Sequence, residues 1–538
     1  MSYQPWWVLH DPWGVAFLLS LLPLLANFDL LRYGGWVSDD IDGILGFDGK
    51  LRDPKTQRYT WTRTLSWVRH VIGRSPNPEH LKDKTKLAFL PNPRKHHALS
   101  IGLSMLTSAL AYLWLRQLIG SNLAVLAVAL WSVHPVASQV TQWPSGIGYG
   151  SAAFFLFSSL NVAWALGVGW WGALAFAPLF MLGLYCQFTV MCIVPVLLYL
   201  HAWPVAGVAL LCSLWEARRT YRNAVAIRTK NFTDQQMGGS TKFHLRRLIF
   251  AVKTWGYYCR HLLWPKRMGL YHSWNYHNPP TACYATGEFW AGLALAASAV
   301  AAGLSGPPSL TFALVWMGCF LFFVLNWITV MQVVTERYAW LPALGMCLAV
   351  ATVAPLWLVL ILFGCALART WAHLPTYYDD ERFYLSNIWN FPQSEVAYGN
   401  LGVTWLRMGF PGAAADAWTR GSRLNPGYDV PSYNLYSLFR SNGQLDVARA
   451  HLVTALSAPT CHFPDLWSKE LSRLDAERAF YQQSMQVPEP QRLAWQAQWL
   501  HQQLLNPHAL YRDLWRTMFE QAVVKMKQQP AAQPGAPT

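Results

Sequence analysis

Ionisable side chains are scarce in this sequence. Asp, Glu, Lys and Arg make up only 13% of the 538 residues, whereas 53% are hydrophobic and 30 are tryptophan. Soluble domains carry about 25% charged residues, so this composition excludes an ordinary soluble protein. The apolar residues also fall in long blocks, which is typical of a chain that crosses a membrane several times.

Other common features are missing too. The nine cysteines form no C-x-x-C pair and no zinc-binding spacing. A zinc site is therefore not indicated, and we expect the cysteines to serve as small buried apolar residues. The N-terminus has no basic segment followed by a small-residue cleavage site, so we expect the first apolar segment to remain as a helix.

The apolar blocks predict an all-α, polytopic membrane domain. We count about eleven spans, several of them short enough to need tilt or neighbouring helices. They cover residues 14–30, 97–117, 121–134, 150–167, 168–184, 188–202, 203–215, 286–304, 309–331, 338–353 and 355–370. With the N-terminus inside, the loops before the second and after the third span both lie outside.

The formal net charge of +15 is concentrated in loops 48–95 and 216–267 and in the C-terminal tail. Nucleic acid is not an expected partner of a multispan chain. Basic residues beside a bilayer meet lipid headgroups, and here also the phosphate of an anionic lipid-linked substrate. A generic lipid-facing surface explains the charge as well. The first loop reads as an interfacial helix, and His96 and His97 are expected to face lipid.

Adjacent carboxylates, Asp39 and Asp40, follow the first apolar segment. Paired acids can hold a divalent cation or split their pKa values so that one remains a base. An Asp-rich turn that caps a helix is the structural alternative. The third span ends in a loop that begins Val133-His134-Pro135 and is expected on the same face.

Segment 248–264 is apolar but contains basic residues that are costly at mid-bilayer. These are Lys253, Arg260 and His261. We therefore interpret the segment as re-entrant or interfacial, which makes 216–285 one outer region. This choice puts Glu336-Arg337-Tyr338 on the side of the aspartates, and a spanning segment would put it on the opposite side.

After residue 371 the composition is typical of a soluble protein, and the sequence contains a repeat. Asn400-Leu401, Gly409 and Ala414 recur 34 residues later as Asn434-Leu435, Gly443 and Ala448. This period is typical of tetratricopeptide repeats, whose stacked helix pairs form a concave surface for peptides or proteins. We expect residues 390–460 to dock an acceptor or partner, with a structural cap as the alternative.

Several motifs occur in a recognisable order. They are Trp36-Val37-Ser38-Asp39-Asp40, the run from His97 to the His-Pro-Val at 134–136, Tyr257 to Pro265, Glu336-Arg337-Tyr338-Ala339-Trp340-Leu341-Pro342, and the repeats. Over residues 15–460 this order resembles the transmembrane-and-tetratricopeptide glycosyltransferases of the GT-C superfamily, whose eukaryotic members are O-mannosyltransferases.

The resemblance implies transfer of a sugar from a polyprenyl-phosphate carrier to a protein or glycan acceptor outside the cytoplasm. It assigns Asp39 and Asp40 the role of general base, or of ligands to a divalent cation (Mg²⁺ or Mn²⁺) if the reaction depends on metal. Arg337 is a candidate phosphate contact, since a guanidinium binds phosphate oxygens in pairs. The other substrate-binding candidates are Glu336, Tyr338, Arg260, His261 and His134. A helix-joining ion pair is the alternative for Glu336 and Arg337.

The chain departs from the family pattern at three places. Relatives commonly have a Glu where this chain has Gln139, an Arg and an Asp at Ile147 and Tyr149, and a Lys-Glu pair at Cys186-Gln187. Gln139 cannot serve as an anionic metal ligand. A changed substrate, a metal-independent mechanism and lost catalysis all fit, so a non-catalytic membrane scaffold of the same fold is the alternative. A transporter suits the long amphipathic loops and the repeats less well.

The predicted organisation is a membrane domain over 1–371, repeats over 372–527 and a disordered tail over 528–538. Within the first domain, 29–96 and 216–285 are the large outer loops. Compact loops and a short repeat array favour a bacterial inner membrane with the repeats in the periplasm. The triplet Asn231-Phe232-Thr233 is a glycosylation sequon that would matter only in a eukaryotic lumen.

Overall fold

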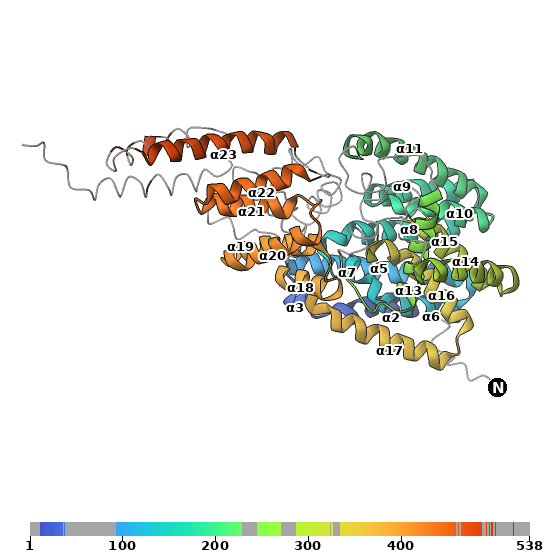
Figure 1. Cartoon of the computed structure of the whole chain (residues 1–538). Helices are drawn as coiled ribbons and strands as arrows, with labels where there is room; N and C mark the ends of the chain where they lie inside the picture. Colours follow the sequence, from blue (N-terminus) through green and yellow to red (C-terminus); the bar gives the residue numbers. More distant parts are fainter. Residues whose placement is uncertain are drawn as a thin grey trace, which may run out of the picture. The chain divides into compact units, whose positions relative to one another are not determined.

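The computed structural model describes residues 11–35, 37, 93–228, 245–270, 287–322, 324–325, 334–458, 461, 464–486 and single positions after 490. The chain forms two compact units, Met1–Thr404 and Trp405–Thr538. All regular elements in the described ranges are helical (Figure 1), which confirms the all-α prediction for them. Asp39, Asp40, most of 29–96, part of 216–285 and the tail lie outside these ranges.

The first unit contains most of the helices. They are α2 (Pro12–Asn27), α3 (Leu30–Tyr33), α5 (Pro93–Ile119), α6 (Ser121–Val133), η4 (Pro135–Ala137), α7 (Ser138–Thr141), η5 (Pro144–Gly146), α8 (Ile147–Ala165), α9 (Trp170–Cys186), η6 (Phe188–Cys192), α10 (Ile193–Tyr199), α11 (Trp203–Arg228), α13 (Leu245–Leu263), α14 (Gly287–Ser305), α15 (Pro308–Phe322), α16 (Glu336–Val353), α17 (Leu356–His373), η9 (Leu374–Tyr377) and α18 (Asp380–Asn390). Helix α19 (Glu395–Arg407) crosses the boundary between the units.

Large aromatic side chains form the core of the first unit, where α5, α6, α8, α15 and α16 pack together. Trp114 and Trp316 lie with ring centroids 5.7 Å apart, and Trp131 stacks on Trp340 at 5.0 Å. The indole N–H of Trp131 donates to the carbonyl of Trp340 at 2.8 Å. Trp131 therefore buries a large apolar area and still satisfies its polar edge.

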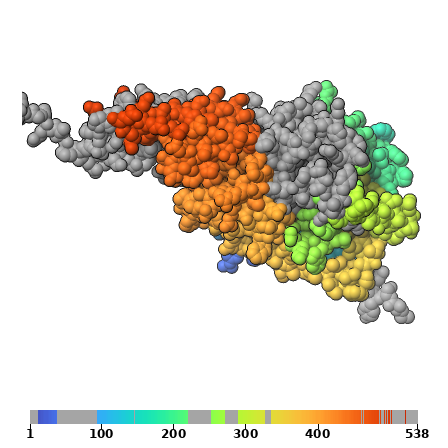
Figure 2. Space-filling view, viewed as in Figure 1, coloured from blue at the N-terminus to red at the C-terminus, as the bar shows by residue number. Residues whose placement is uncertain are grey.

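Two helices are each long and apolar enough to cross a membrane: Pro93–Ile119, and Leu356–Tyr377, which combines α17 with η9. The pair Ser121–Val133 and Pro135–Thr141, bent by 54°, forms a third if counted as one span. Helix α17 reaches the surface in Figure 2 and exposes apolar side chains, Trp357 among them at 63%. The remaining apolar helices of the described residues are shorter, so the eleven-span bundle stays a prediction.

Several local expectations meet the structure. Pro355 separates α16 from α17, because its ring cannot continue the preceding helix. Residues 248–263 lie within one amphipathic helix, α13, whose Lys253 and His261 are buried and whose Arg260 is exposed. The expectation for His97 was wrong: it is buried, and its Nε2 lies 3.1 Å from the carbonyl oxygen of Gly35.

The helices that lie within the described part of the second unit are α20 (Pro411–Leu424), α21 (Val430–Ser441), α22 (Leu445–Ser457) and α23 (Pro464–Ser484). Gly409 and Gly443 both adopt positive φ, 85° and 73°, which only glycine adopts without strain. Ala414 and Ala448 are fully buried. The positions that repeat in the sequence thus have matching conformations.

The division between the units falls after Thr404 rather than after residue 371. The segment just beyond 371 packs into the first unit: the rings of Tyr377 and Phe383 lie 5.8 Å apart, and the carbonyl of Tyr377 accepts from the amide of Gly35 at 3.2 Å. The residues from 372 to 404, whose composition is typical of soluble proteins, therefore belong to the first compact unit.

Candidate functional site

The candidate site includes the sharp turn between α6 and α7. His134 follows α6 and caps η4, where Pro135 prevents continuation of the helix. Its Nδ1 accepts from the amide of Val136 at 3.2 Å. The other nitrogen, Nε2, therefore carries the proton and donates to the carbonyl of Leu262 at 2.9 Å. His134 thus fastens the end of α13 to this corner, and both ring nitrogens contact the protein backbone.

The Glu336 carboxylate lies at the start of α16 and is fully buried. Its Oε1 accepts from the amide of Gly269 at 2.9 Å, and its Oε2 accepts from the side-chain amide of Gln139. The Nε2 of His261 lies 3.5 Å from Oε1. Buried charge requires such partners. The structure therefore joins Glu336 to protein groups from α7, α13 and the segment that follows α13.

Gln139 is the centre of this polar cluster. Its Oε1 accepts from the hydroxyl of Thr335 at 2.6 Å and from the amide of Arg337 at 3.3 Å. Its Nε2 donates to the carbonyl of Gly269 at 3.1 Å as well as to Glu336. A backbone amide can only donate, so the contact with Arg337 fixes which side-chain atom of Gln139 is oxygen. A carboxylate at this position could not make the donated bonds.

Helix α13 contributes two buried groups beside the cluster. The ring of His261 stacks on Tyr257 with centroids 5.7 Å apart. The hydroxyl of Tyr258 donates to the carbonyl of Thr335 at 3.3 Å and accepts from the Thr335 amide at 3.2 Å. Burial raises the pKa of Tyr258 well above its ordinary value, so the phenol stays protonated and can donate. These contacts hold the residue before Glu336.

Arg337 is buried, with 6% of its surface exposed, and aromatic rings surround its guanidinium. The Cζ atom lies 5.3 Å from the ring centroid of Trp143, 5.8 Å from that of Tyr149 and 5.8 Å from that of Tyr338. Ring faces attract a cation electrostatically. Arg337 is thus held in a defined place, and Tyr338 contributes one wall of its enclosure.

Arg260 differs from its neighbour His261 because successive residues of a helix point about 100° apart. It is exposed, with Cζ 5.5 Å from the centroid of Tyr257. The structure therefore brings His134, His261, Glu336, Arg337 and Tyr338 to one region of the first unit and leaves Arg260 at the surface.

The segment that leads to the acidic pair is described up to Val37. The indole N–H of Trp143 donates to the carbonyl of Val37 at 3.2 Å. Asp39 and Asp40 themselves lie outside the described residues. Among the described residues no three His, Cys, Asp or Glu side chains gather to hold a metal ion. Both carboxylate oxygens of Glu336 accept hydrogen bonds from protein donors.

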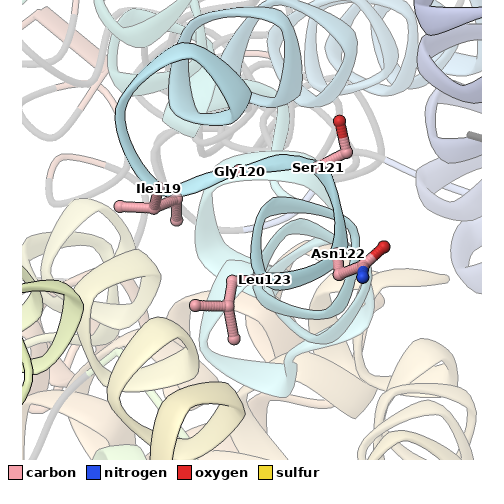
Figure 3. A pocket seen from close by; sticks show the side chains of 5 residues that line it. All are labelled: Ile119, Gly120, Ser121, Asn122 and Leu123. Atoms are coloured by element: carbon pink, nitrogen blue, oxygen red, sulfur yellow. The ribbon is translucent and has the colours of Figure 1, made fainter. Parts of the chain in front are cut away.

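A hollow of about 290 Å³ lies elsewhere, at the turn between α5 and α6 (Figure 3). Its walls come from one short stretch: Ile119, Gly120, Ser121, Asn122 and Leu123. None of these side chains ionises near neutral pH, so the hollow offers no acid, base or phosphate-binding charge. We therefore place the candidate site at the Gln139–Arg337 cluster.

Sequence reasoning missed the central role of Gln139, which it treated only as the loss of an acid. It also missed Thr335, Gly269 and Trp143. Local sequence carries little signal for them, because each acts through partners more than 60 residues away. No protein-family profile, curated protein or solved structure matches the chain.

Proposed function

We propose that the chain is an integral-membrane glycosyltransferase that takes a sugar from a polyprenyl-phosphate carrier. The observation that carries the proposal is Arg337: a buried guanidinium enclosed by Trp143, Tyr149 and Tyr338. Arginine binds phosphate oxygens in pairs, and the aromatic enclosure holds it ready at little further entropic cost.

A bilayer setting is supported by exposed apolar side chains beyond the two long helices. Trp170 and Trp171 at the start of α9 are 71% and 79% exposed, and Leu211 on α11 is 69% exposed. Tryptophan at helix ends is typical of membrane interfaces. We therefore propose a polytopic GT-C-type bundle with its site on the extracytoplasmic side, in a bacterial inner membrane.

The last described residue before the acidic pair, Val37, is connected to Arg337 through Trp143. Consecutive Cα atoms are 3.8 Å apart, so Asp39 lies at most about 8 Å from Val37. The carbonyl of Val37 accepts a hydrogen bond from the indole N–H of Trp143, and the ring of Trp143 contacts the Arg337 guanidinium. We propose that the acidic pair and the phosphate-binding cation act in one region, as sugar transfer requires.

The proposed step is a displacement at the anomeric carbon. The acceptor hydroxyl oxygen attacks, Asp39 or Asp40 takes its proton, and the bond between anomeric carbon and phosphate oxygen breaks. The electron pair leaves with the polyprenyl phosphate, whose charge Arg337 stabilises. A divalent cation bound by the acidic pair would add charge stabilisation. The tetratricopeptide-like helices over 390–460 would dock the protein or glycan acceptor.

A non-catalytic membrane scaffold is the second candidate. Gln139 favours the scaffold, because its carboxamide stands where members of the GT-C family commonly have a Glu. The carboxamide binds protein groups here. In this case the repeats would bind a protein partner, and Arg337 would be structural.

Labelled-sugar transfer distinguishes the two candidates. The purified protein in lipid is given a panel of polyprenyl-phosphate sugars, and the wild type is compared with Asp39→Asn and Asp40→Asn. We expect one variant to lose transfer by at least about 100-fold while it still binds donor. Equal transfer in both variants would refute the site, and absence of both transfer and donor binding would favour the scaffold.

A further inference from the structure

The backbone of Gly269 connects two side chains of the candidate site. Its amide donates to Oε1 of Glu336 at 2.9 Å, and its carbonyl accepts from Nε2 of Gln139 at 3.1 Å. The Oε1 of Gln139 in turn accepts from the amide of Arg337 at 3.3 Å. Gly269 and Gln139 therefore hold the first turn of α16, which carries the proposed phosphate contact.

Helix α18 and its C-terminal cap cover the α-carbon of Gly269. A Cβ added there would lie 2.7 Å from Oδ1 of Asn387 and 3.1 Å from Cε2 of Phe391, and the first distance is shorter than real Cβ contacts. Asn387 is fully buried, and its Nδ2 donates to the carbonyl of Phe383 at 2.8 Å. Gly269 does not adopt positive φ, so the lack of space requires a glycine here.

The segment around Gly269 is fixed on both sides of it. Met268 and Leu270 are buried. Just upstream, the guanidinium of Arg369 on α17 donates to the carbonyls of Pro265 at 3.2 Å and Lys266 at 3.0 Å. Buried segments are close-packed, so a shift at Gly269 is passed on to its neighbours. A side chain at 269 would have to displace Asn387 or strain the bonds to Glu336 and Gln139.

We propose that α18 completes the candidate site, with Asn387 as a positioning residue that acts on Glu336 and Arg337 through Gly269. This inference rests on the proposed function. A guanidinium binds phosphate oxygens in pairs only in the right orientation, so the placement of the first turn of α16 matters. The site then depends on a helix from beyond residue 371, where the composition is typical of a soluble protein.

Three variants of the full chain test the contact between Asn387 and Gly269. Gly269→Ala adds the Cβ that meets Asn387, and Asn387→Ala leaves a gap beside Gly269. The double variant fills the gap with the added Cβ. Residues in contact have non-additive effects, so the double variant should behave more like the wild type than either single variant.

Each single variant has a matched control. Gly345→Ala overpacks α16 beyond its first turn, because a Cβ at Gly345 would lie 2.6 Å from the carbonyl oxygen of Ala313. Asn390→Ala removes a local bond of the kind that Asn387 makes, since Nδ2 of Asn390 donates to the carbonyl of Ser386 at 3.0 Å. Both controls change packing or local bonding away from Gly269.

The first readout is binding of a polyprenyl phosphate to the protein in lipid nanodiscs. We expect Gly269→Ala to weaken binding at least about tenfold and Asn387→Ala about threefold. The double variant should recover to within about twofold of the wild type, and both controls should match the wild type. Asn387→Ala still tests the contact if Gly269→Ala does not fold. Single variants that bind like their controls, or a double variant no better than Gly269→Ala, would overturn the proposal.

The second readout does not depend on the ligand. Hydrogen exchange at the start of α16, which includes the amides of Arg337 and Tyr338, is compared in the same proteins. We expect exchange at least about tenfold faster in Gly269→Ala than in Gly345→Ala, with recovery in the double variant. If the wild type binds no polyprenyl phosphate but exchange behaves this way, the proposed function fails and the positioning role stands. Equal exchange in Gly269→Ala and Gly345→Ala would overturn the positioning role.

Discussion

Each unit of the chain buries a charged cluster, and the two clusters neutralise their charges differently. In the second unit the guanidinium of Arg440 lies between two carboxylates. Its Nη1 is 2.9 Å from Oε2 of Glu470, and its Nη2 is 2.9 Å from Oε2 of Glu477. In the first unit neighbouring Glu336 and Arg337 point to different surroundings. Amide donors bind the carboxylate, and aromatic rings enclose the guanidinium.

The difference indicates what each cluster is for. Burial opposes the charge of Arg440, but the carboxylates of Glu477 and Glu470 raise its pKa above the ordinary value, so the charges are mutually satisfied and stabilise the packing of α21 on α23. The guanidinium of Arg337 is enclosed by ring faces instead. We therefore interpret the second cluster as structural, and Arg337 stays the proposed phosphate contact.

The largest effect is expected from Arg440→Ala. This change leaves the carboxylate of Glu477, which is 4% exposed, without the Arg440 cation, and leaves Glu470 paired with Arg473 alone. Breaking a buried pair from one side costs about 3–5 kcal/mol. Chemical denaturation of the full chain, followed by hydrogen exchange in α21–α23, measures the loss.

Arg449→Ala is the control for this prediction, because Arg449 pairs with Asp475 at the surface, where their side chains are 40% and 41% exposed. Surface pairs contribute little, so the control should melt like the wild type. Equal losses in the two variants would mean that burial does not distinguish these ion pairs.

The next largest effect is expected from Gln139→Glu, which sets a second carboxylate against Glu336. Lost donated bonds and like-charge repulsion should lower the free energy of unfolding by about 2–4 kcal/mol at pH 7. Repulsion raises the folded pKa of the pair above about 4.3, the unfolded value. The folded variant then binds more protons, so its stability falls as pH rises through the folded pKa.

Denaturation of Gln139→Glu at pH 5 and pH 7 therefore gives a signed test. The loss relative to the wild type should be smaller at pH 5. Gln117→Glu, at an exposed position on α5, should show no such pH dependence. A variant that is unaffected at pH 7 would show that the carboxamide of Gln139 is not needed.

A smaller effect is expected from Thr335→Val. Valine keeps the shape but removes the hydroxyl that donates to Gln139 at 2.6 Å, which should cost about 1 kcal/mol. Thr107→Val is the control, because Thr107 is also buried and its hydroxyl donates within its own helix, to the carbonyl of Leu103 at 2.6 Å. Thermal unfolding of both variants measures the difference, and equal melting temperatures would contradict a special role of the Thr335 hydroxyl.

The smallest effect concerns pH and the second unit. Burial lowers the pKa of His451, whose ring stacks on Phe439 with centroids 5.4 Å apart. The unfolded state therefore binds more protons, so the contribution of His451 is complete above about pH 6.5 and is lost as pH falls. Hydrogen exchange in α22, corrected for intrinsic rates, should show weaker protection at pH 5 than at pH 7. His451→Gln should reduce this difference, and an unchanged difference would exclude His451 as its source.

Local patterns predicted those features that depend on local sequence. The break at Pro355, the helical class and the matching glycines at 409 and 443 follow from backbone chemistry within a few residues. The bond from Gln139 to Thr335 spans 196 residues, so no local period could reveal it. The resemblance pointed to Glu336 and Arg337, and the structure shows that their charged groups have separate environments.

The most direct test of the central claim is binding of a polyprenyl phosphate to the protein in lipid nanodiscs. Wild type is compared with Arg337→Gln and with Arg382→Gln, whose guanidinium also lies over a tyrosine ring, 5.8 Å from Tyr378, but at the surface. The account predicts that Arg337→Gln weakens binding by at least about tenfold and that Arg382→Gln does not. Equal affinity in all three proteins would contradict a phosphate-binding role for Arg337.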